Sequence, residues 1–146
     1  MIHIREFAAR DYDEVIHLWH ATEGIVLRTV DERPFVEQYL RQNPGLSFVA
    51  CDEDRRIVGA VLCGTDGRRG YLQHLAVVPA HRGHGIGRTL AERAVAALAE
   101  QHIEKCHIMV VQGNTAARAF WARLGWIERS DISVMSHTVS RDAKAE

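Results

Sequence analysis

The chain has 146 residues, of which 47% are hydrophobic and 25% charged, and its formal net charge is −1 at pH 7. This length predicts one domain with a single core over residues 1–138, followed by a polar tail over residues 139–146. The nearly balanced charge argues against nucleic acid as a partner. No apolar stretch approaches the roughly 18 residues that cross a membrane, so no membrane partner is expected. Three widely spaced cysteines and the lack of an apolar leader indicate reduced thiols in a cytoplasmic protein.

Hydrophobic periodicity predicts an alternation of strands and helices along the chain. In order, the predicted elements are a strand over 2–7, a helix over 11–21, a short helix after Pro34, strands over 46–51, 57–63 and 71–77, a helix over 85–100, a strand over 106–111 and a last strand over 132–135. The first helix is expected to turn Val15, Leu18 and Trp19 inward. The strand over 106–111 reads as too apolar to lie at a sheet edge. This order predicts a mixed α/β sheet.

A glycine-rich loop separates the fourth predicted strand from the long helix. Residues 81–88 read H-R-G-H-G-I-G-R, with three glycines at alternate positions and an arginine on either side. Bare backbone N–H groups, a helix N-terminus and two guanidinium groups around one point favour a phosphate or pyrophosphate. A dinucleotide fingerprint fails because arginine and leucine stand where its third glycine belongs, and no G-K-[ST] completes a Walker loop. The pattern R-x-x-G-x-G fits instead, through Arg82, Gly85 and Gly87.

A second motif follows in residues 114–126, which read N-T-A-A-R-A-F-W-A-R-L-G-W. Asn114 is a good N-cap for a short helix, and Gly125 suits the left-handed position that ends one. Four apolar residues of this helix share one face, namely Ala117, Phe120, Trp121 and Leu124. Alone, the segment also fits an ordinary capped amphipathic helix.

Taken together, the two motifs resemble the GNAT superfamily of acyl-CoA-dependent N-acetyltransferases. Its loop pattern is [QR]-x-x-G-x-[GA], and its later signature is N-x-x-A-x-x-[FY]-Y-x-x-x-G-[FW]. The resemblance extends over most of the chain and is strongest over residues 71–126. It implies a mixed, mostly antiparallel central sheet with flanking helices, in which the fourth and fifth strands are parallel and splay apart.

The resemblance also implies acetyl-CoA as co-substrate. Backbone N–H groups of the loop are expected to bind its pyrophosphate, and a main-chain N–H near the end of the fourth strand is expected to polarise the acetyl carbonyl. The implied cofactor-binding residues are Leu75, Ala76, Val77, Arg82, Gly83, His84, Gly85, Ile86, Gly87, Arg88, Asn114, Ala117 and Phe120. No C-x-x-C or H-E-x-x-H spacing occurs, so no metal ion is expected.

The catalytic positions depart from the family pattern. Trp121 stands where the family has a tyrosine proposed as general acid, and an indole N–H cannot supply a proton near neutral pH. His74 is the residue of the fourth strand that titrates near neutrality, which makes it the candidate base. Because side chains alternate along a strand, Gln73 and His74 face the same side only if a bulge intervenes. Packing of His74 beneath a helix stays open as the alternative, as does core packing of Trp121.

The acceptor site is expected in residues 1–46, which carry five arginines and eight acidic residues. An acidic lip suits a cationic amine, and Glu23 and Arg28 are its candidate acceptor-binding residues. The sequence therefore predicts an N-acetyltransferase that moves an acetyl group to a small-molecule or peptide amine by direct attack, and two copies could form a homodimer. A non-catalytic acetyl-CoA sensor is the main alternative, and a helix-capping scaffold without nucleotide is a third.

Overall fold

The computed structural model describes residues 1–140, which form two compact units, Met1–Met109 and the part of the chain from Val110 onward. The strands of the first unit are β1 (His3–Glu6), β2 (Phe48–Cys51), β3 (Ile57–Thr65), β4 (Gly70–Val77) and β5 (Cys106–Ile108). Its helices are α1 (Tyr12–Ala21), α2 (Arg33–Gln42) and α3 (Ile86–Glu100), with 3-10 turns η1 (Ala9–Asp11), η2 (Thr29–Asp31) and η3 (Pro79–His81). The second unit contains α4 (Thr115–Arg123).

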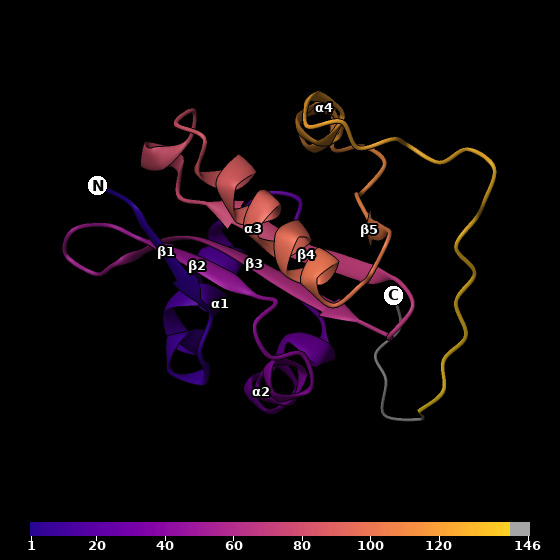
Figure 1. The fold of residues 1–146 in the computed structure, drawn as a ribbon, viewed down its shortest axis with the longest axis horizontal. Coiled ribbons are helices and arrows are strands. Elements are labelled where there is room, and N and C mark those ends of the chain that lie inside the picture. The colour runs from indigo at the N-terminus through magenta and orange to yellow at the C-terminus, as the bar shows by residue number, and fades with distance from the viewer. Residues whose placement is uncertain (141–146) are drawn as a thin grey trace. The chain divides into compact units, whose positions relative to one another are not determined.

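The strands form one sheet in the order β1-β2-β3-β4-β5. The first three pairings are antiparallel and β4 pairs with β5 in parallel, which confirms the predicted mixed sheet with flanking helices (Figure 1). The last β4–β5 pair is Leu72 with Ile108, whereas β4 continues to Val77. The end of β4 therefore runs on past the last pair with its neighbour.

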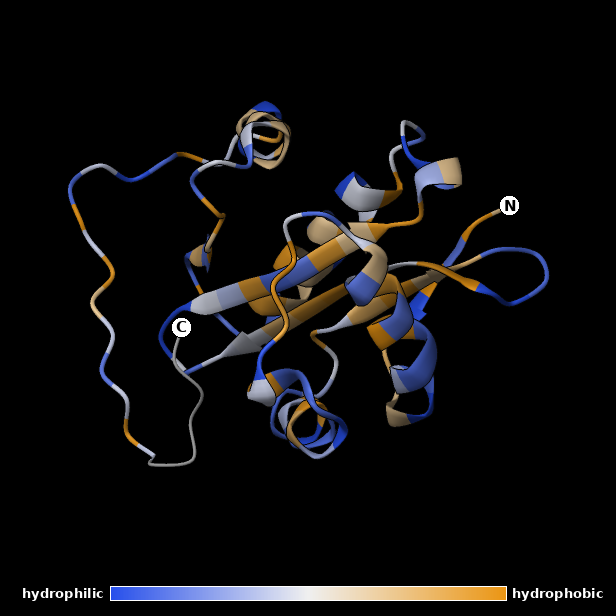
Figure 2. Cartoon of the chain, turned by 180° about the vertical axis from the view of Figure 1, so that it is seen from behind, coloured by the Kyte–Doolittle hydropathy of each residue, from blue (hydrophilic) through white to orange (hydrophobic). Residues whose placement is uncertain are grey.

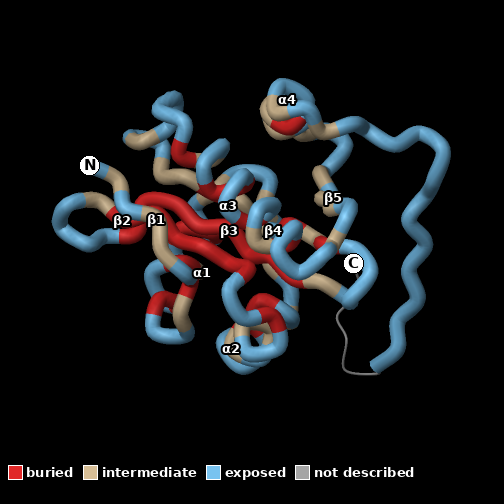
Figure 3. Tube along the Cα trace, viewed as in Figure 1, coloured by how far each residue is buried: buried red, intermediate tan, exposed pale blue. Residues whose placement is uncertain are grey.

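Helices cover both faces of the sheet. α1 packs on β3 and β4 from one side, and α3 packs on β2, β3 and β4 from the other (Figures 1 and 2). Every residue of β3 except Thr65 is buried, so this strand is the centre of the core (Figure 3). The inward residues predicted for the first helix are confirmed, because Val15, Leu18 and Trp19 are all buried.

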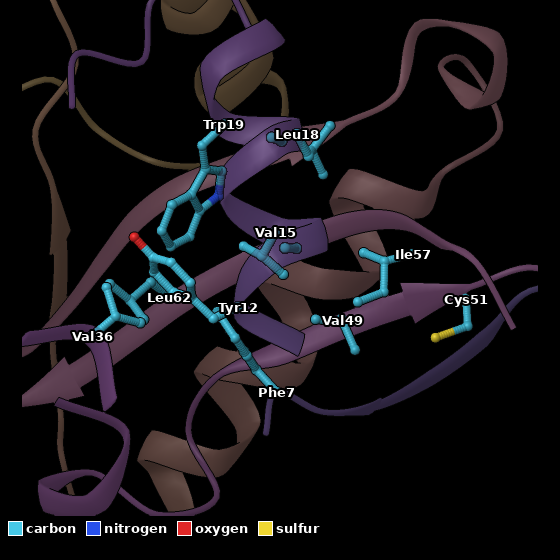
Figure 4. Close-up of a cluster of buried hydrophobic side chains, with 12 residues drawn as sticks. Phe7, Tyr12, Val15, Leu18, Trp19, Val36, Val49, Cys51, Ile57 and Leu62 are labelled. Carbon is cyan, nitrogen blue, oxygen red and sulfur yellow. The ribbon is translucent and has the colours of Figure 1, made fainter. Parts of the chain in front are cut away.

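The core beneath α1 joins the two N-terminal helices to the sheet. Figure 4 shows Val15 and Trp19 of α1 beside Leu62 of β3 and Val36 of α2. The indole of Trp19 is completely buried and meets the Phe7 ring edge-on, with centroids 6.2 Å apart. Burying a side chain of this size contributes on the order of 2–3 kcal/mol, so Trp19 anchors α1 firmly.

Two predictions about the C-terminal strands are wrong. β5 is the edge strand of the sheet in the described chain, and it stops at Ile108, so Met109 and Val111 are exposed. The predicted strand over 132–135 does not form, and its apolar side chains are exposed. An alternating apolar pattern makes a strand only where a neighbouring strand pairs with it, and pairing is a property of the fold rather than of the segment.

The second unit contains the capped helix that the sequence predicts. The Asn114 side chain accepts a hydrogen bond from the Ala117 N–H at 3.1 Å, and α4 follows it. Gly125 has φ +91° just after the helix, in the predicted left-handed position. No helix within residues 1–140 is both long and apolar enough to cross a membrane.

Candidate functional site

The glycine-rich loop leads from β4 into α3 by two left-handed turns. The 3-10 turn η3 begins at Pro79, and the fixed φ of proline suits the first position of a helical turn. Gly83 and Gly85 both have φ +82°, a region that costs a residue with a Cβ about 1–2 kcal/mol. Gly85 is the N-cap of α3, so the second left-handed turn starts the helix.

This geometry leaves a row of unused donors. Across the described chain, none of the backbone N–H groups of residues 83–88 donates a hydrogen bond to a protein acceptor. The first N–H groups of a helix lack partners within the helix, and they carry its positive partial charge. A Cβ added at Gly83 or Gly85 would meet no atom within 4 Å, so these two glycines border open space. The loop can therefore accept an anion.

The two flanking arginines are held differently. Arg82 Nε donates to the Val77 carbonyl oxygen at 2.8 Å, which ties the loop to the end of β4 and leaves its other guanidinium N–H groups available. Arg88 Nε pairs with Glu92 at 2.7 Å on the exposed face of α3. Because such exposed pairs contribute about 0–1 kcal/mol, Arg88 can exchange this partner for an anion at little cost.

A pocket of about 450 Å³ lies beside the loop. His81 and His84 line it on the loop side, and Asp52, Glu53 and Asp54 line it from the β2–β3 turn. Three carboxylates along its wall disfavour an anion there. The row of N–H groups, rather than this pocket, is the place for a phosphate.

The edge of β4 that faces β5 is open near its end. Within residues 1–140 no strand pairs with this edge beyond Leu72, so Leu75, Ala76 and Val77 lie past the last β4–β5 pair. The Val78 N–H bonds to Val58 of β3, so the backbone groups of Val77 point the opposite way, toward the open edge. The Val77 carbonyl oxygen already accepts Arg82 Nε, but the Val77 N–H on this edge is available to an extended ligand.

A β-bulge interrupts β4 at His74. Ala76 pairs with Ala60 and Gln73 pairs with Leu62, so two residues of β4 face the single intervening residue of β3. His74 is the first of these two residues and has φ +52°, which is unusual for a residue other than glycine. From the sequence, side-chain alternation requires a bulge if Gln73 and His74 are to face the same side of the sheet. With this bulge present, both side chains reach toward the face covered by α1 and α2.

The His74 ring lies between α1 and η2. Its Nε2 is 2.9 Å from Oδ1 of Asp31, and its ring centroid is 4.9 Å from that of Trp19. The Asp31 side chain is 5% exposed, and its Oδ2 also accepts the Arg28 N–H at 2.9 Å. Burial by itself raises the pKa of Asp31, but the hydrogen bonds from His74 and Arg28 outweigh it and hold the pKa below its usual value. Asp31 is therefore a carboxylate at neutral pH.

Tyr39 of α2 lies beside the same stretch of β4. Its hydroxyl is 3.4 Å from Gln73 Nε2, and burial raises the pKa of Tyr39 to about 12. A Cβ added at Gly64 would overlap the Tyr39 hydroxyl and ring, so only glycine fits at that position of β3. Tyr39 is therefore a neutral hydroxyl in a fixed place.

Three other predicted residues are Glu23, Arg28 and Trp121. Glu23 and Arg28 are exposed in the segment between α1 and η2, and neither side chain has a hydrogen bond or ion pair within the described chain. In the second unit, Trp121 is buried between Phe120 and Trp126, with ring centroids 5.1 and 4.8 Å away. This aromatic cluster packs α4 against the residues that follow it.

Sequence reasoning missed Asp31. Asp31 lies 43 residues from His74, in a short turn that matches no motif. Its one local signal is the cap that it provides to the Arg28 N–H at the start of η2. That signal describes a turn and gives no hint of a histidine.

Comparisons with known proteins agree with these features. The model of the acetyltransferase (GNAT) family matches residues 12–126. An acetyltransferase of Pectobacterium atrosepticum is 33% identical over 121 residues, which cover 83% of this chain and 84% of the relative. An acetyltransferase of Yersinia pestis (strain Pestoides F) is 32% identical over 129 residues, which cover 88% and 90%.

Two solved structures share the fold. The NatC complex bound to Gag peptide and CoA contains a chain that matches with a TM-score of 0.76 at 24% identity, over 88% of this chain and 86% of that one. An aminoglycoside acetyltransferase from an uncultured soil metagenomic sample, in complex with sisomicin, matches with a TM-score of 0.74 at 19% identity, over 95% and 97%.

Proposed function

Since the chain belongs to the GNAT acetyltransferase family, we propose that it moves an acetyl group from acetyl-CoA to a primary amine by direct attack in a ternary complex. The observation that carries this proposal is the row of N–H groups over residues 83–88 that have no partner within residues 1–140. A pyrophosphate fits such a row, because it is anionic and offers several acceptor oxygens to donors at a helix N-terminus.

The proposed cofactor site extends from the loop along β4. The N–H groups of residues 83–88 hold the pyrophosphate, and Arg82 and Arg88 add positive charge. The open edge at Leu75, Ala76 and Val77 takes the pantetheine arm, and a main-chain N–H there polarises the acetyl carbonyl. Within the second unit, the family resemblance also assigns cofactor-binding roles to Asn114, the N-cap of α4, and to Ala117 and Phe120 of α4. The proposed site uses no metal ion, and residues 1–140 bring together no group of three or more metal-ligating side chains.

The proposed chemistry needs a neutral amine and a leaving thiolate. His74 takes the proton from the amine, since its imidazole is the group on β4 suited to accept a proton near neutral pH. A thiol has a pKa of about 8.5, so the CoA sulfur can leave as a thiolate without a strong general acid. Trp121, at the family's tyrosine position, is then a packing or hydrogen-bonding residue and does not supply a proton.

The acceptor is proposed as a primary amine of a small molecule or peptide, received near Glu23 and Arg28. The solved relatives with a Gag peptide and with sisomicin support an amine acceptor of either kind. One acetyltransferase domain over residues 1–138 is supported by the family match, which spans parts of both compact units. A homodimer and a cytoplasmic location stay predictions, and part of the polar tail lies outside the described residues.

Calorimetric titration of acetyl-CoA into the wild type, Gly85→Asp and Gly85→Asn tests the cofactor site. Asp and Asn both tolerate the left-handed conformation and differ mainly in charge. We expect binding to be lost in Gly85→Asp and largely kept in Gly85→Asn, because only the former places a negative charge beside the pyrophosphate. Absence of binding in the wild type would refute the proposal.

Release of CoA with a panel of amines then tests the transfer itself. Thiol release that depends on the amine, together with a mass increase of one acetyl group on that amine, supports the transferase. Tight acetyl-CoA binding without release across small-molecule and peptide amines would instead favour a sensor.

A further inference from the structure

Two buried aspartates of this fold have nearly the same local setting but different partners. Asp11 accepts the Ala8 N–H at 2.8 Å in η1, and Asp31 accepts the Arg28 N–H at 2.9 Å in η2. Each is the third residue of a 3-10 turn and caps the residue before that turn. Both carboxylate oxygens of Asp11 also accept hydrogen bonds from the Arg5 guanidinium, which is a purely structural partner. Asp31 uses its other oxygen on a titratable imidazole.

The hydrogen bond fixes the tautomer of that imidazole. Because Asp31 is an ionised acceptor, His74 Nε2 carries the proton and donates it to Oδ1. The lone pair of the neutral ring is then on Nδ1. No group in residues 1–140 hydrogen-bonds to Nδ1, and the His74 side chain is 18% exposed, so this nitrogen is accessible from outside the core. The bulge and the φ of +52° hold the ring in this orientation.

Resting on the proposed acetyl transfer, we propose that Asp31 is a positioning residue that holds His74 as the Nε2–H tautomer, with Nδ1 as the atom that takes the proton from the acceptor amine. In the transfer step, the amine nitrogen forms a bond to the acetyl carbon and gives one proton to Nδ1. The carbon–sulfur bond breaks, and its electron pair leaves on the CoA sulfur. Asp31 stays ionised and stabilises the imidazolium that forms.

Asp31 is the charged group in hydrogen-bond contact with His74. Arg28 is cationic throughout the working range of pH. Tyr12 of α1 donates its hydroxyl to the Asp31 carbonyl oxygen, and burial is the main cause of its raised pKa. Tyr39 of α2, which contacts the neighbouring Gln73, also has a raised pKa. Both tyrosines are therefore neutral at neutral pH.

The test compares Asp31→Asn with the matched control Asp11→Asn. Both variants remove a carboxylate from a 3-10 cap, so both lower stability, but only Asp31 touches His74. In Asp31→Asn we expect kcat at saturating acetyl-CoA to fall between about 10-fold and 10⁴-fold, the range for a misoriented or lost general base. The KM for acetyl-CoA should not change. The acid limb of the kcat/KM profile should move to lower pH, because the imidazolium loses its counter-charge.

The third variant, His74→Asn, removes the base but keeps a residue that tolerates a left-handed φ. We expect it to lose kcat by roughly 10²-fold or more, and adding Asp31→Asn to it should cost little further activity. Equal activity losses in Asp31→Asn and Asp11→Asn at equal folded fraction, with an unmoved pH profile, would overturn the proposal. So would full additivity of the two site variants.

A measurement independent of activity separates this inference from the proposed function. Nitrogen-15 NMR of the histidine rings reports the tautomer of His74 in the free protein. We expect Nε2–H in the wild type and in Asp11→Asn, and a changed or mixed tautomer in Asp31→Asn. A wild-type ring protonated on Nδ1 would refute the positioning role even in an active enzyme. Failure of CoA release from a protein with the expected tautomer would instead refute the acetyl transfer, and with it the catalytic use of Nδ1.

Discussion

The left-handed glycines of the loop give the sharpest quantitative expectation. A Cβ at Gly83 or Gly85 would meet no atom within 4 Å, so an alanine at either position is opposed by the backbone conformation alone. For an L-residue, the left-handed region costs about 1–2 kcal/mol. At 1.4 kcal/mol for each factor of ten, this corresponds to roughly 5- to 30-fold in an equilibrium constant.

The penalty must appear in one of two measurements. If Gly85→Ala keeps the left-handed turn, the free energy of unfolding falls by about 1–2 kcal/mol and acetyl-CoA affinity stays the same. If the loop relaxes in the free protein, stability is kept and the affinity falls, because binding must restore the turn. The loss in the free energy of unfolding and the loss in the free energy of acetyl-CoA binding are therefore expected to add up to about 1–2 kcal/mol, both for Gly83→Ala and for Gly85→Ala.

Denaturant unfolding and calorimetric titration of the same samples measure both parts. Gly113→Ala is the matched control, since its Cβ also meets nothing within 4 Å and its φ lies outside the left-handed region. That replacement should be neutral or stabilising by up to about 1 kcal/mol. If Gly83→Ala and Gly85→Ala change neither stability nor affinity beyond the control, the left-handed turns do not shape the anion site.

Three further predictions concern the sheet. Ser47→Ala should lower the free energy of unfolding by about 1–3 kcal/mol, because its buried hydroxyl accepts the Cys63 N–H and donates to the Cys63 carbonyl; an unchanged urea midpoint would contradict this. Burial raises the pKa of Cys63 to about 12 and that of Cys106 to about 11. Because the folded protein keeps these thiols protonated to a higher pH than the unfolded chain does, their contribution to the free energy of unfolding is fully present below the ordinary thiol pKa of about 8.5. It is lost as pH rises toward the two folded-state pKa values. Over that pH range the urea midpoint should therefore fall less in Cys63→Ala than in wild type. In Gly70→Ala the new Cβ overlaps the Leu98 side chain of α3, so the free energy of unfolding should fall by about 1–3 kcal/mol, as measured by thermal unfolding. An unshifted melting temperature would show that Leu98 can move aside without cost.

Features with short-range causes could be predicted from the sequence. The cap at Asn114, the left-handed Gly125 and the loop before α3 each depend on a few neighbouring residues, and the structure contains them. The inward face of α1 follows from a helical period, and its residues are buried. Such features need no knowledge of what lies opposite them.

Features that depend on a neighbouring strand could not be predicted from the sequence alone. β5 ends at Ile108 although the apolar run continues to Val111, because pairing with β4 stops there. The segment over 132–135 alternates like a strand but has no partner in the described chain. Apolar alternation reports that a segment can join a sheet, and the sheet decides whether it does.

The candidate base shows the same limit most clearly. His74 could be singled out because histidine is a residue type suited to proton transfer near neutral pH, but the direction of its side chain depends on one extra residue of β4 opposite β3. A strand without that bulge would send Gln73 and His74 to opposite faces. Asp31 then meets the ring only because η2 is packed beside α1, at a separation of 43 residues. No local pattern reports either event.

The energetic balance at His74 also separates a structural role from a chemical one. A left-handed φ at a residue other than glycine costs about 1–2 kcal/mol. A hydrogen bond to a charged partner such as Asp31 contributes about 1.5–3 kcal/mol. Because the two terms nearly offset each other, the arrangement adds little net stability. Asparagine at position 74 tolerates the same φ but loses the hydrogen bond to Asp31, so His74→Asn should lower the free energy of unfolding by about 1.5–3 kcal/mol. Compared at equal folded fraction, a large loss of turnover in that variant must come from the imidazole.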